Sequence, residues 1–384
     1  MLPRLLHGSA LFGGLFLLTL SAAGLARTDE PKGDKERPPA RGLTPKKVTL
    51  KADSLLLSKA LKEVEKQTGL AVEDRRNRED SAYKDAELKL DLKGVTFWQA
   101  IDAIAKEADL SVSLYERDGK LALREGPFRQ VPTSYGGIFR TTVRRISAVR
   151  DLETDGHLCV ATLEVAWEPG FQPLFYETKP DSLVVKDDKM RELPVKGDGS
   201  GKAAVRGPAN ATEIELRLPA PKRQVQSLGL LRGSLTMTVP QQMLDFTFKT
   251  LDKEKAAKEP QLTKEGVTVK LTRLEFARAY WSVQVTLEYP KGGPNFESFQ
   301  NWVVRNQLFL KRAGGDGVMW EQKLGGYSVD SLGPNRAVIT YGIVDEPKRK
   351  LYRGKPEEWK VVYRTPGAIV EVPAAFEFKD VPLP

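Results

Sequence analysis

The sequence predicts a multidomain protein, in which a small α+β domain of element order βαββαββ is followed by two tandem all-β, immunoglobulin-like sandwiches. Three observations lead to this prediction. First, an amphipathic helical pattern occurs twice within residues 48–125. Second, from about Pro127 the sequence pattern is that of short strands separated by turn signals. Third, a charged segment at 251–260 divides this β-rich part in two. At 384 residues the chain is long enough for several domains with their own cores.

The first 26 residues have the organisation of a secretory signal peptide. Arg4 supplies the positive charge, residues 11–20 are mostly apolar, and the Gly-Leu-Ala tripeptide at 24–26 offers small residues at a cleavage position. The apolar run is shorter than the ~20 residues of a membrane span. We therefore expect an exported protein with no integral membrane segment after signal cleavage, an uncleaved N-terminal anchor being the alternative. Residues 27–47, rich in proline and charge, are predicted to be a disordered linker.

Apolar residues from Leu57 to Thr68 fall at helical spacing and predict the first helix of the small domain. Apolar side chains recur at helical spacing, and lysines and glutamates fill the other face. We expect Asp53 or Ser54 to cap the start of this helix, and Gly69 to end it in a left-handed conformation. Alternating apolar residues at 48–50 and 70–72 predict a strand on each side. The apolar helix positions are Leu57, Ala60, Leu61, Val64 and Thr68.

The same helical pattern recurs 40 residues later, so that Phe97 occupies the position equivalent to Leu57. Thr96 or Gly94 is expected to begin this second helix, with strands at 88–92 and 110–114. Asp118-Gly119 then predicts a tight turn into a last strand, Lys120–Arg124. We expect these strands to form one small sheet with two helices on one face. The apolar positions of the second helix are Phe97, Ala100, Ile101, Ile104 and Ala108.

Residues 48–125 thus combine two related stretches, ADSLLLSKALKEVEKQTGL and LKLDLKGVTFWQAIDAIAKEADLSV, with a final hairpin. This combination resembles the short N-terminal domains of bacterial secretins and TonB-dependent receptors. The resemblance implies a periplasmic docking or signalling module without chemistry of its own. Neither a secretin pore region nor a receptor barrel follows in the sequence, so the resemblance does not imply gating or transport.

Residues 127–250 are predicted to form the first β-sandwich, and residues 262–384 the second. Alternating apolar residues mark their central strands. The two regions end alike, in LTMTVPQQMLDFTF at 235–248 and AIVEVPAAFEFKDVPLP at 368–384. This tandem resembles uncharacterised exported proteins of the planctomycete type, which implies no activity. The alternating positions are Cys159, Ala161, Leu163, Val165 and Trp167 in the first region, and Trp281, Val283, Val285, Leu287 and Tyr289 in the second.

Histidine and cysteine are too scarce for most catalytic and metal chemistry. Cys159 is the only cysteine, so it cannot form an intrachain disulfide, and His157 is the only histidine after the signal peptide. A multi-His/Cys zinc site is therefore excluded. We expect Cys159 to be buried and inert, and His157 to be a hairpin residue. The sequence predicts no catalytic, cofactor-binding or metal-binding residues, and no cofactor.

Two groups of residues offer weaker functional signals. Carboxylates and arginines alternate after the first helix, where they could dock a partner or bind an ion, although a solvated, self-neutralising loop is the simpler interpretation. Tryptophans could stack on sugar rings if exposed, although core packing is the simpler interpretation for them. The loop residues are Glu73, Asp74, Arg75, Arg76, Arg78, Glu79 and Asp80, and the tryptophans are Trp98, Trp281, Trp302, Trp320 and Trp359.

The formal net charge of +9 is spread over interleaved acidic and basic residues. This distribution indicates solubility and a weak affinity for anionic envelope polymers. The sequence contains no block of basic residues interleaved with aromatics, so we do not expect nucleic acid as a partner.

We therefore expect an exported, non-catalytic protein of the bacterial periplasm or cell envelope that binds or docks protein partners. The alternative is a carbohydrate-binding or carbohydrate-processing envelope protein. A free strand edge on the small sheet would favour docking by strand addition, whereas a groove with two carboxylates and an exposed tryptophan would favour the alternative.

Overall fold

The computed structural model describes residues 43–77, 79, 83–154, 156–195, 201–205, 209–248, 261–277, 280–290, 303, 306–313, 319–323, 326–344 and 359–384. They belong to one compact unit, Ala40–Pro384. The predicted signal peptide at 1–26 and residues 27–42 of the predicted linker lie outside the described residues. β-Strands make up most of the described chain, which contains two α-helices. Neither helix has the length and apolar character needed to cross a membrane.

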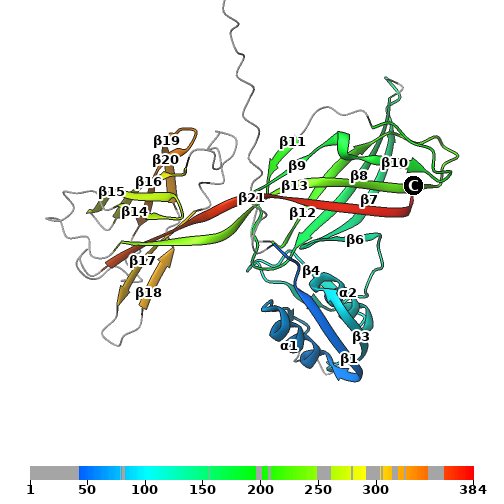
Figure 1. The fold of residues 1–384 in the computed structure, drawn as a ribbon, viewed down its shortest axis with the longest axis horizontal. Coiled ribbons are helices and arrows are strands. Elements are labelled where there is room, and N and C mark those ends of the chain that lie inside the picture. The colour runs from blue at the N-terminus through cyan, green and yellow to red at the C-terminus, as the bar shows by residue number, and fades with distance from the viewer. Residues whose placement is uncertain are drawn as a thin grey trace, which may run out of the picture. The chain divides into compact units, whose positions relative to one another are not determined.

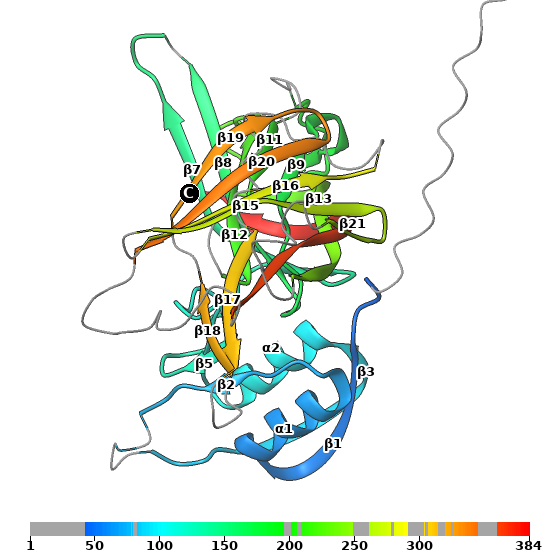
Figure 2. The same cartoon turned by 90° about the vertical axis from the view of Figure 1, so that its left-hand side faces the viewer.

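The N-terminal region, residues 47–124, contains both helices and two small sheets (Figures 1 and 2). β1 pairs antiparallel with β3 as a two-stranded ribbon. β2, β5 and β4 form the second sheet, in which β2 runs parallel to β5. The expectation of one small sheet is therefore wrong, because the short β2 pairs with the last strand of the region and not with the ribbon. The elements are β1 (Lys47–Leu56), α1 (Leu57–Thr68), β2 (Glu73–Asp74), β3 (Glu87–Thr96), α2 (Phe97–Glu107), β4 (Ser111–Ser113) and β5 (Ala122–Arg124).

Both helices bury the faces that their periodicity predicts. In α1 the five predicted apolar positions are the buried ones, and in α2 four of the five predicted positions are buried, Ala108 being the C-cap residue. Gly69 ends α1 at φ 72°, a conformation that favours glycine. Thr96 caps α2 in a reciprocal capping box with Gln99.

The predicted cap of α1 is wrong. Asp53 and Ser54 belong to β1, which continues to Leu56 because that strand pairs with β3 up to its end. Asp85 takes the capping role from the segment before β3: it accepts hydrogen bonds from the Ser58 backbone N–H at 3.1 Å and from the Ser58 hydroxyl at 2.6 Å. The helix therefore begins without a turn after the strand, and its free amides are satisfied from a distant part of the sequence.

Three further sheets form the rest of the described chain. They are a four-stranded sheet of order β12-β8-β7-β6, a five-stranded sheet of order β14-β15-β16-β20-β19, and a seven-stranded sheet of order β11-β9-β13-β21-β17-β18 in which β10 also pairs with β13. Their strands are β6 (Thr133–Gly136), β7 (Phe139–Arg150), β8 (His157–Trp167), β9 (Phe175–Thr178), β10 (Val184–Asp187), β11 (Gly201–Ala204), β12 (Ala211–Leu218), β13 (Ser227–Phe248), β14 (Gln261–Lys264), β15 (Val267–Ala277), β16 (Tyr280–Glu288), β17 (Gln307–Ala313), β18 (Met319–Lys323), β19 (Gly326–Leu332), β20 (Arg336–Val344) and β21 (Trp359–Pro382).

The seven-stranded sheet is shared between the two β regions. β13 and β21 pair antiparallel in an unbroken register from Ser227 opposite Pro382 to Phe248 opposite Val361 (Figure 1). The two segments that end alike in sequence are thus the two strands that pair. The structure differs here from the tandem expected at 127–250 and 262–384, because the last strand of each region enters the core of the other.

The two cores lie on opposite faces of this shared sheet. Leu235 and Met237 pack in the first core, against the four-stranded sheet, whereas Leu244, Phe246 and Phe248 pack in the second core, against the five-stranded sheet. Successive side chains of a strand point to opposite faces. On β9 the neighbours Phe175 and Tyr176 pack against the second and the first core respectively, so the two cores lie on opposite faces of the sheet. β13 and β21 therefore bind the two cores together.

Candidate functional site

Helix α2 joins the N-terminal region to the first β core. Trp98, 1% exposed, donates a hydrogen bond from its indole Nε1 to the Ile138 carbonyl at 3.1 Å. Asn210 adds a second junction, because its side chain donates to the Gly119 carbonyl at 2.7 Å and its backbone N–H donates to the Leu114 carbonyl at 3.1 Å. The prediction of core packing is confirmed for Trp98.

A buried ion pair lies at the same junction. Asp102 Oδ2 on α2 accepts hydrogen bonds from Arg140 Nε at 2.7 Å and from the Tyr135 hydroxyl at 2.6 Å. Arg140 also lies 3.8 Å from Glu164. The Asp102 and Arg140 side chains are each 9% exposed, so both charges are nearly desolvated and depend on each other. The second oxygen, Asp102 Oδ1, is buried without a hydrogen-bond partner.

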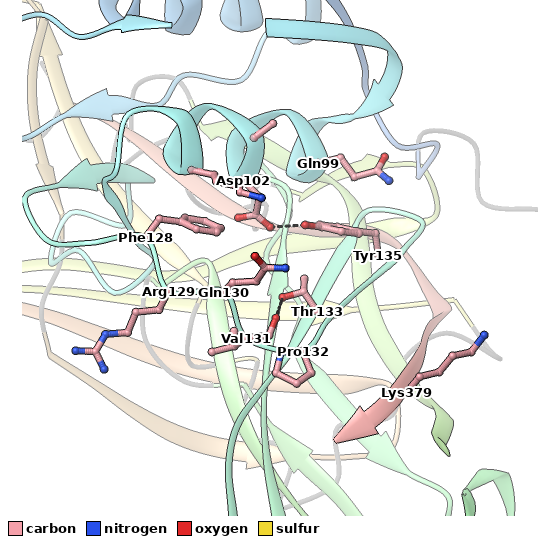
Figure 3. Close-up of a pocket in the computed structure, with 12 residues that line it drawn as sticks. Gln99, Asp102, Phe128, Arg129, Gln130, Val131, Pro132, Thr133, Tyr135 and Lys379 are labelled. Atoms are coloured by element: carbon pink, nitrogen blue, oxygen red, sulfur yellow. Dashed lines mark hydrogen bonds between the residues drawn. The ribbon is translucent and has the colours of Figure 1, made fainter. Parts of the chain in front are cut away.

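A pocket of about 610 Å³ opens beside this ion pair (Figure 3). Its wall combines α2, the segment that precedes β6, β6 itself and the end of β21. Burial and the Asp102 carboxylate raise the pKa of the Tyr135 hydroxyl, so this hydroxyl remains protonated and donates to Asp102. The lining includes Asp102, Phe128, Gln130, Thr133, Tyr135 and Lys379.

The polar groups of this pocket suit ligand binding. In Figure 3 the Asp102 carboxylate, the Tyr135 hydroxyl and the Gln130 amide point toward one another, with the Phe128 ring beside them. Small-molecule sites combine apolar contacts with a few convergent polar groups, and this pocket has both, although polar and charged residues make up most of its lining. Sequence reasoning missed this site. Asp102 follows Trp98 by one helical turn on the buried side of α2, and a charge at that position is the signal that could have found it.

Glu168 is a second buried carboxyl with an unsatisfied oxygen. It is 1% exposed, and its Oε1 accepts a hydrogen bond from the Lys46 backbone N–H at 3.1 Å. Its Oε2 has no partner. Burial raises the pKa of this carboxyl to about 7, while the Lys46 amide and ammonium groups oppose the shift. Glu168 follows β8 and Lys46 precedes β1, so this contact also joins the N-terminal region to the first β core.

The charged loop after α1 is largely self-neutralised. Arg75 binds Glu73 and Glu116, each at 2.7 Å, and also Asp118. The hydrogen bonds from Arg124, Ser113 and Arg75 lower the pKa of Glu116 to about 2. The charges in the described part of the loop are thus neutralised, as expected, but the loop is not solvated throughout, because the side chains of the Arg76–Asp74 pair are only 9% and 3% exposed. Positions 78 and 80 lie outside the described residues.

The remaining candidates behave as scaffold residues where the structure describes them. Cys159 is buried and free, and burial raises the pKa of its thiol. His157 lies opposite Arg150 at the end of the β7–β8 hairpin, as predicted. Within the described ranges, no three His, Cys, Asp or Glu side chains are close enough to hold a metal ion. Trp302 and the side chains of Trp281, Trp320 and Trp359 lie outside the described residues.

Several strand edges are protected against pairing with another chain. On the β1–β3 ribbon, Gln67 bonds both the N–H and the carbonyl of Thr49 at 2.9 Å, and Glu107 accepts from the Lys89 N–H at 3.4 Å. The edge strand β12 exposes Glu213, Glu215 and Arg217. Side-chain caps, charges and short strands are the usual means of blocking an edge.

The edge strand β19 is less protected, although its pairing with β20 shifts register between Val329 and Ser331. Every residue from Gly326 to Ser331 is exposed, including Tyr327 at 53% and Val329 at 41%. The strand contains no lysine, arginine or proline, and Asp330 is its only charged residue. Asp330 is occupied by Gln284, Thr340 and Ser328 on its own sheet. Among the described strands, β19 pairs only with β20.

No protein-family model matches this sequence, and no curated protein is significantly similar to it.

Proposed function

We propose that the protein is an exported, non-catalytic protein of the bacterial periplasm or cell envelope that docks protein partners. In this proposal a strand of the partner adds to the exposed edge of β19. The observation that carries the proposal is the exposed edge of β19, which has no lysine, arginine or proline, whereas side chains cap or charge other edges of the chain. The predicted signal peptide supports export.

Strand addition explains how such an edge would recognise a partner. Main-chain N–H and C=O groups along the edge would supply affinity, and side chains on either face would supply specificity. Tyr327 and Val329 offer an aromatic and a β-branched contact, both of which favour cross-strand pairing. The site that we propose is therefore on the second β core and not on the small sheet.

The proposal includes a finer description of the fold. Residues 48–125 would form a βαββαββ domain similar to the short N-terminal domains of secretins and TonB-dependent receptors, and the two β regions would be immunoglobulin-like sandwiches. The order of β1 to β5 around the two helices supports the first assignment. Antiparallel sheets packed around two apolar cores support the second.

The alternative function, carbohydrate binding or processing, has a specific observation in its favour, which is the pocket beside Asp102. Hydrolysis of a glycosidic bond needs two carboxyl groups across the sugar. The described residues that line this pocket include one carboxylate and no tryptophan. For a saccharide ligand, the pocket therefore favours binding over processing.

The docking proposal is tested by crosslinking in the envelope of the native host. A photoreactive phenylalanine analogue replaces Tyr327, and in a matched control it replaces Glu213 on the charged edge of β12. We expect a discrete protein adduct from position 327 and none from position 213. Absence of a protein adduct at 327, together with retention of the protein on purified cell-wall polysaccharide, would overturn the proposal in favour of the alternative.

A pair of edge variants sharpens the test. The double substitution Tyr327→Lys/Val329→Lys adds the charges by which natural edges resist pairing, so we expect capture of the partner to be lost. Val149→Lys/Leu158→Lys is the control, because these two exposed residues lie opposite each other on the β7–β8 hairpin. Equal loss of capture in both variants would point to a general charge effect.

A further inference from the structure

The pocket beside α2 contains an oxygen that the fold leaves without a hydrogen-bond donor. Both donors that reach the Asp102 carboxylate, Arg140 Nε and the Tyr135 hydroxyl, bind Oδ2. Oδ1 has no partner, although the residue is only 7% exposed. Buried polar atoms are nearly always satisfied, so an unsatisfied carboxylate oxygen beside a pocket indicates a place for a donor. Docking through β19 makes no use of this feature.

Two lining side chains next to the ion pair belong to the stretch between β5 and β6, which has no helix or strand. They are Gln130, which is exposed, and Phe128, which is half-buried. Oδ1 itself is buried, so binding of a ligand at this oxygen requires that lining side chains such as these change rotamer. The Gln130 amide offers both a donor and an acceptor, and the Phe128 ring offers a flat apolar face (Figure 3).

The charges around the pocket decide what kind of donor can enter. The lining includes three cations, Lys106, Arg129 and Lys379, whereas its one carboxylate is already paired with Arg140. Lys379 lies 3.6 Å from Glu377. In Figure 3 the side chains of Arg129 and Lys379 extend outward from the rim. An ammonium or guanidinium ligand would be repelled here, so the donor to Oδ1 has to be a neutral hydroxyl or amide on a molecule that tolerates or carries negative charge.

We propose that this pocket binds one unit of an anionic saccharide. A sugar hydroxyl donates a hydrogen bond to Asp102 Oδ1, and the C–H face of the sugar ring packs on Phe128. The acid groups of the sugar chain lie at the rim, near Lys106 and Arg129. The site binds and does not cleave, because it holds a single carboxylate and that group is engaged by Arg140.

The test is a binding titration of the purified mature chain with a uronic-acid tetrasaccharide at physiological salt. The same tetrasaccharide with its carboxyl groups reduced to alcohols is the neutral comparison. We expect the acidic form to bind at least about tenfold more tightly than the neutral form. Failure of the acidic form to bind, or equal affinity for the two forms, would overturn the proposal.

Substitutions of lining residues then test whether the ligand binds in this pocket. Gln130→Ala and Lys106→Ala/Arg129→Ala change exposed side chains of the pocket, and each is expected to weaken binding about tenfold. Lys62→Ala/Lys93→Ala removes the same charge from α1 and β3, away from the pocket lining, and should leave the affinity unchanged. Equal weakening by the two double variants would mean nonspecific charge attraction and would overturn the site. Partner capture through Tyr327 should persist in Lys106→Ala/Arg129→Ala, which separates this inference from the docking proposal.

Discussion

Arg140 on β7 donates a hydrogen bond over 2.7 Å to Asp102 on α2, and the two side chains are each 9% exposed. This contact links two regions that the sequence pattern describes separately. Burial of such a pair costs desolvation energy. Removal of one partner destabilises the fold more strongly, because the other charge stays buried without a partner. The pair therefore fixes how α2 sits on the first β core.

Arg140→Leu should lower the free energy of unfolding by about 3 to 5 kcal/mol, since Asp102 would keep only the Tyr135 hydroxyl. Urea denaturation of the purified chain measures this change. The double variant Arg140→Leu/Asp102→Leu removes both charges and should recover part of the loss. Lys93→Ala is the control, because it breaks only the exposed 3.6 Å contact with Asp91 and should cost under about 0.5 kcal/mol. Additive losses in the double variant would contradict the coupling.

Glu168 should make stability fall as the pH rises. Its folded-state pKa is raised from 4.5 to about 7, so between these values the folded chain holds a proton that the unfolded chain has released. The stability that this carboxyl contributes is present below pH 4.5 and is lost as the pH passes about 7. Glu168→Gln stays neutral, so its free energy of unfolding should rise by roughly 3 kcal/mol relative to that of the natural chain as the pH goes from 4.5 to 8.

Thermal or urea unfolding at several pH values measures this difference. A constant difference between Glu168→Gln and the natural chain across this range would show that Glu168 does not titrate with folding.

Gly136→Ala should destabilise the contact between β6 and β21. A Cβ at position 136 would lie 2.4 Å from the Ala375 carbonyl oxygen, and a backbone atom has little freedom to move. We expect a loss of about 1 to 3 kcal/mol in urea unfolding. Gly326→Ala is a matched control on β19, where the nearest atom would be at an ordinary 3.5 Å. Similar losses at both positions would mean that the effect comes from strand glycines in general.

The sequence predicts best the features that neighbouring residues determine. The buried faces of α1 and α2 follow from helical periodicity. Gly69 and Thr96 act as caps through local hydrogen bonds, which involve the Gly69 backbone N–H and the Thr96 side chain. The cap of α1 was not predictable in this way, because Asp85 reaches it from beyond a loop. The pairing of β13 with β21 is likewise nonlocal. Periodicity shows that a segment is a strand, but it does not show which strand lies beside it.

Periodicity gives only part of the candidate site. Asp102 is the one charged residue at the buried positions of α2, but the helix alone does not show which residue pairs with it. Arg140 lies 38 residues later on a different sheet, and only the packing of α2 on β7 brings the two together. The exposed edge of β19 also depends on strand order, since nothing in a single strand tells whether it is central or at an edge.

The shared sheet predicts that the two β cores unfold together. β13 and β21 contribute side chains to both cores along one continuous ladder of backbone hydrogen bonds. Phe246 is fully buried in the second core, so Phe246→Ala should lower the free energy of unfolding by about 3 to 5 kcal/mol. Because the ladder continues into the first core, we expect backbone amides of β7 and β8 to exchange faster with solvent deuterium in Phe246→Ala, together with those of β15 and β16. Tyr327→Ala on the exposed edge should change neither set. If exchange accelerates only in β15 and β16, the cores are independent, and the long strands act as a flexible connection between two separate domains.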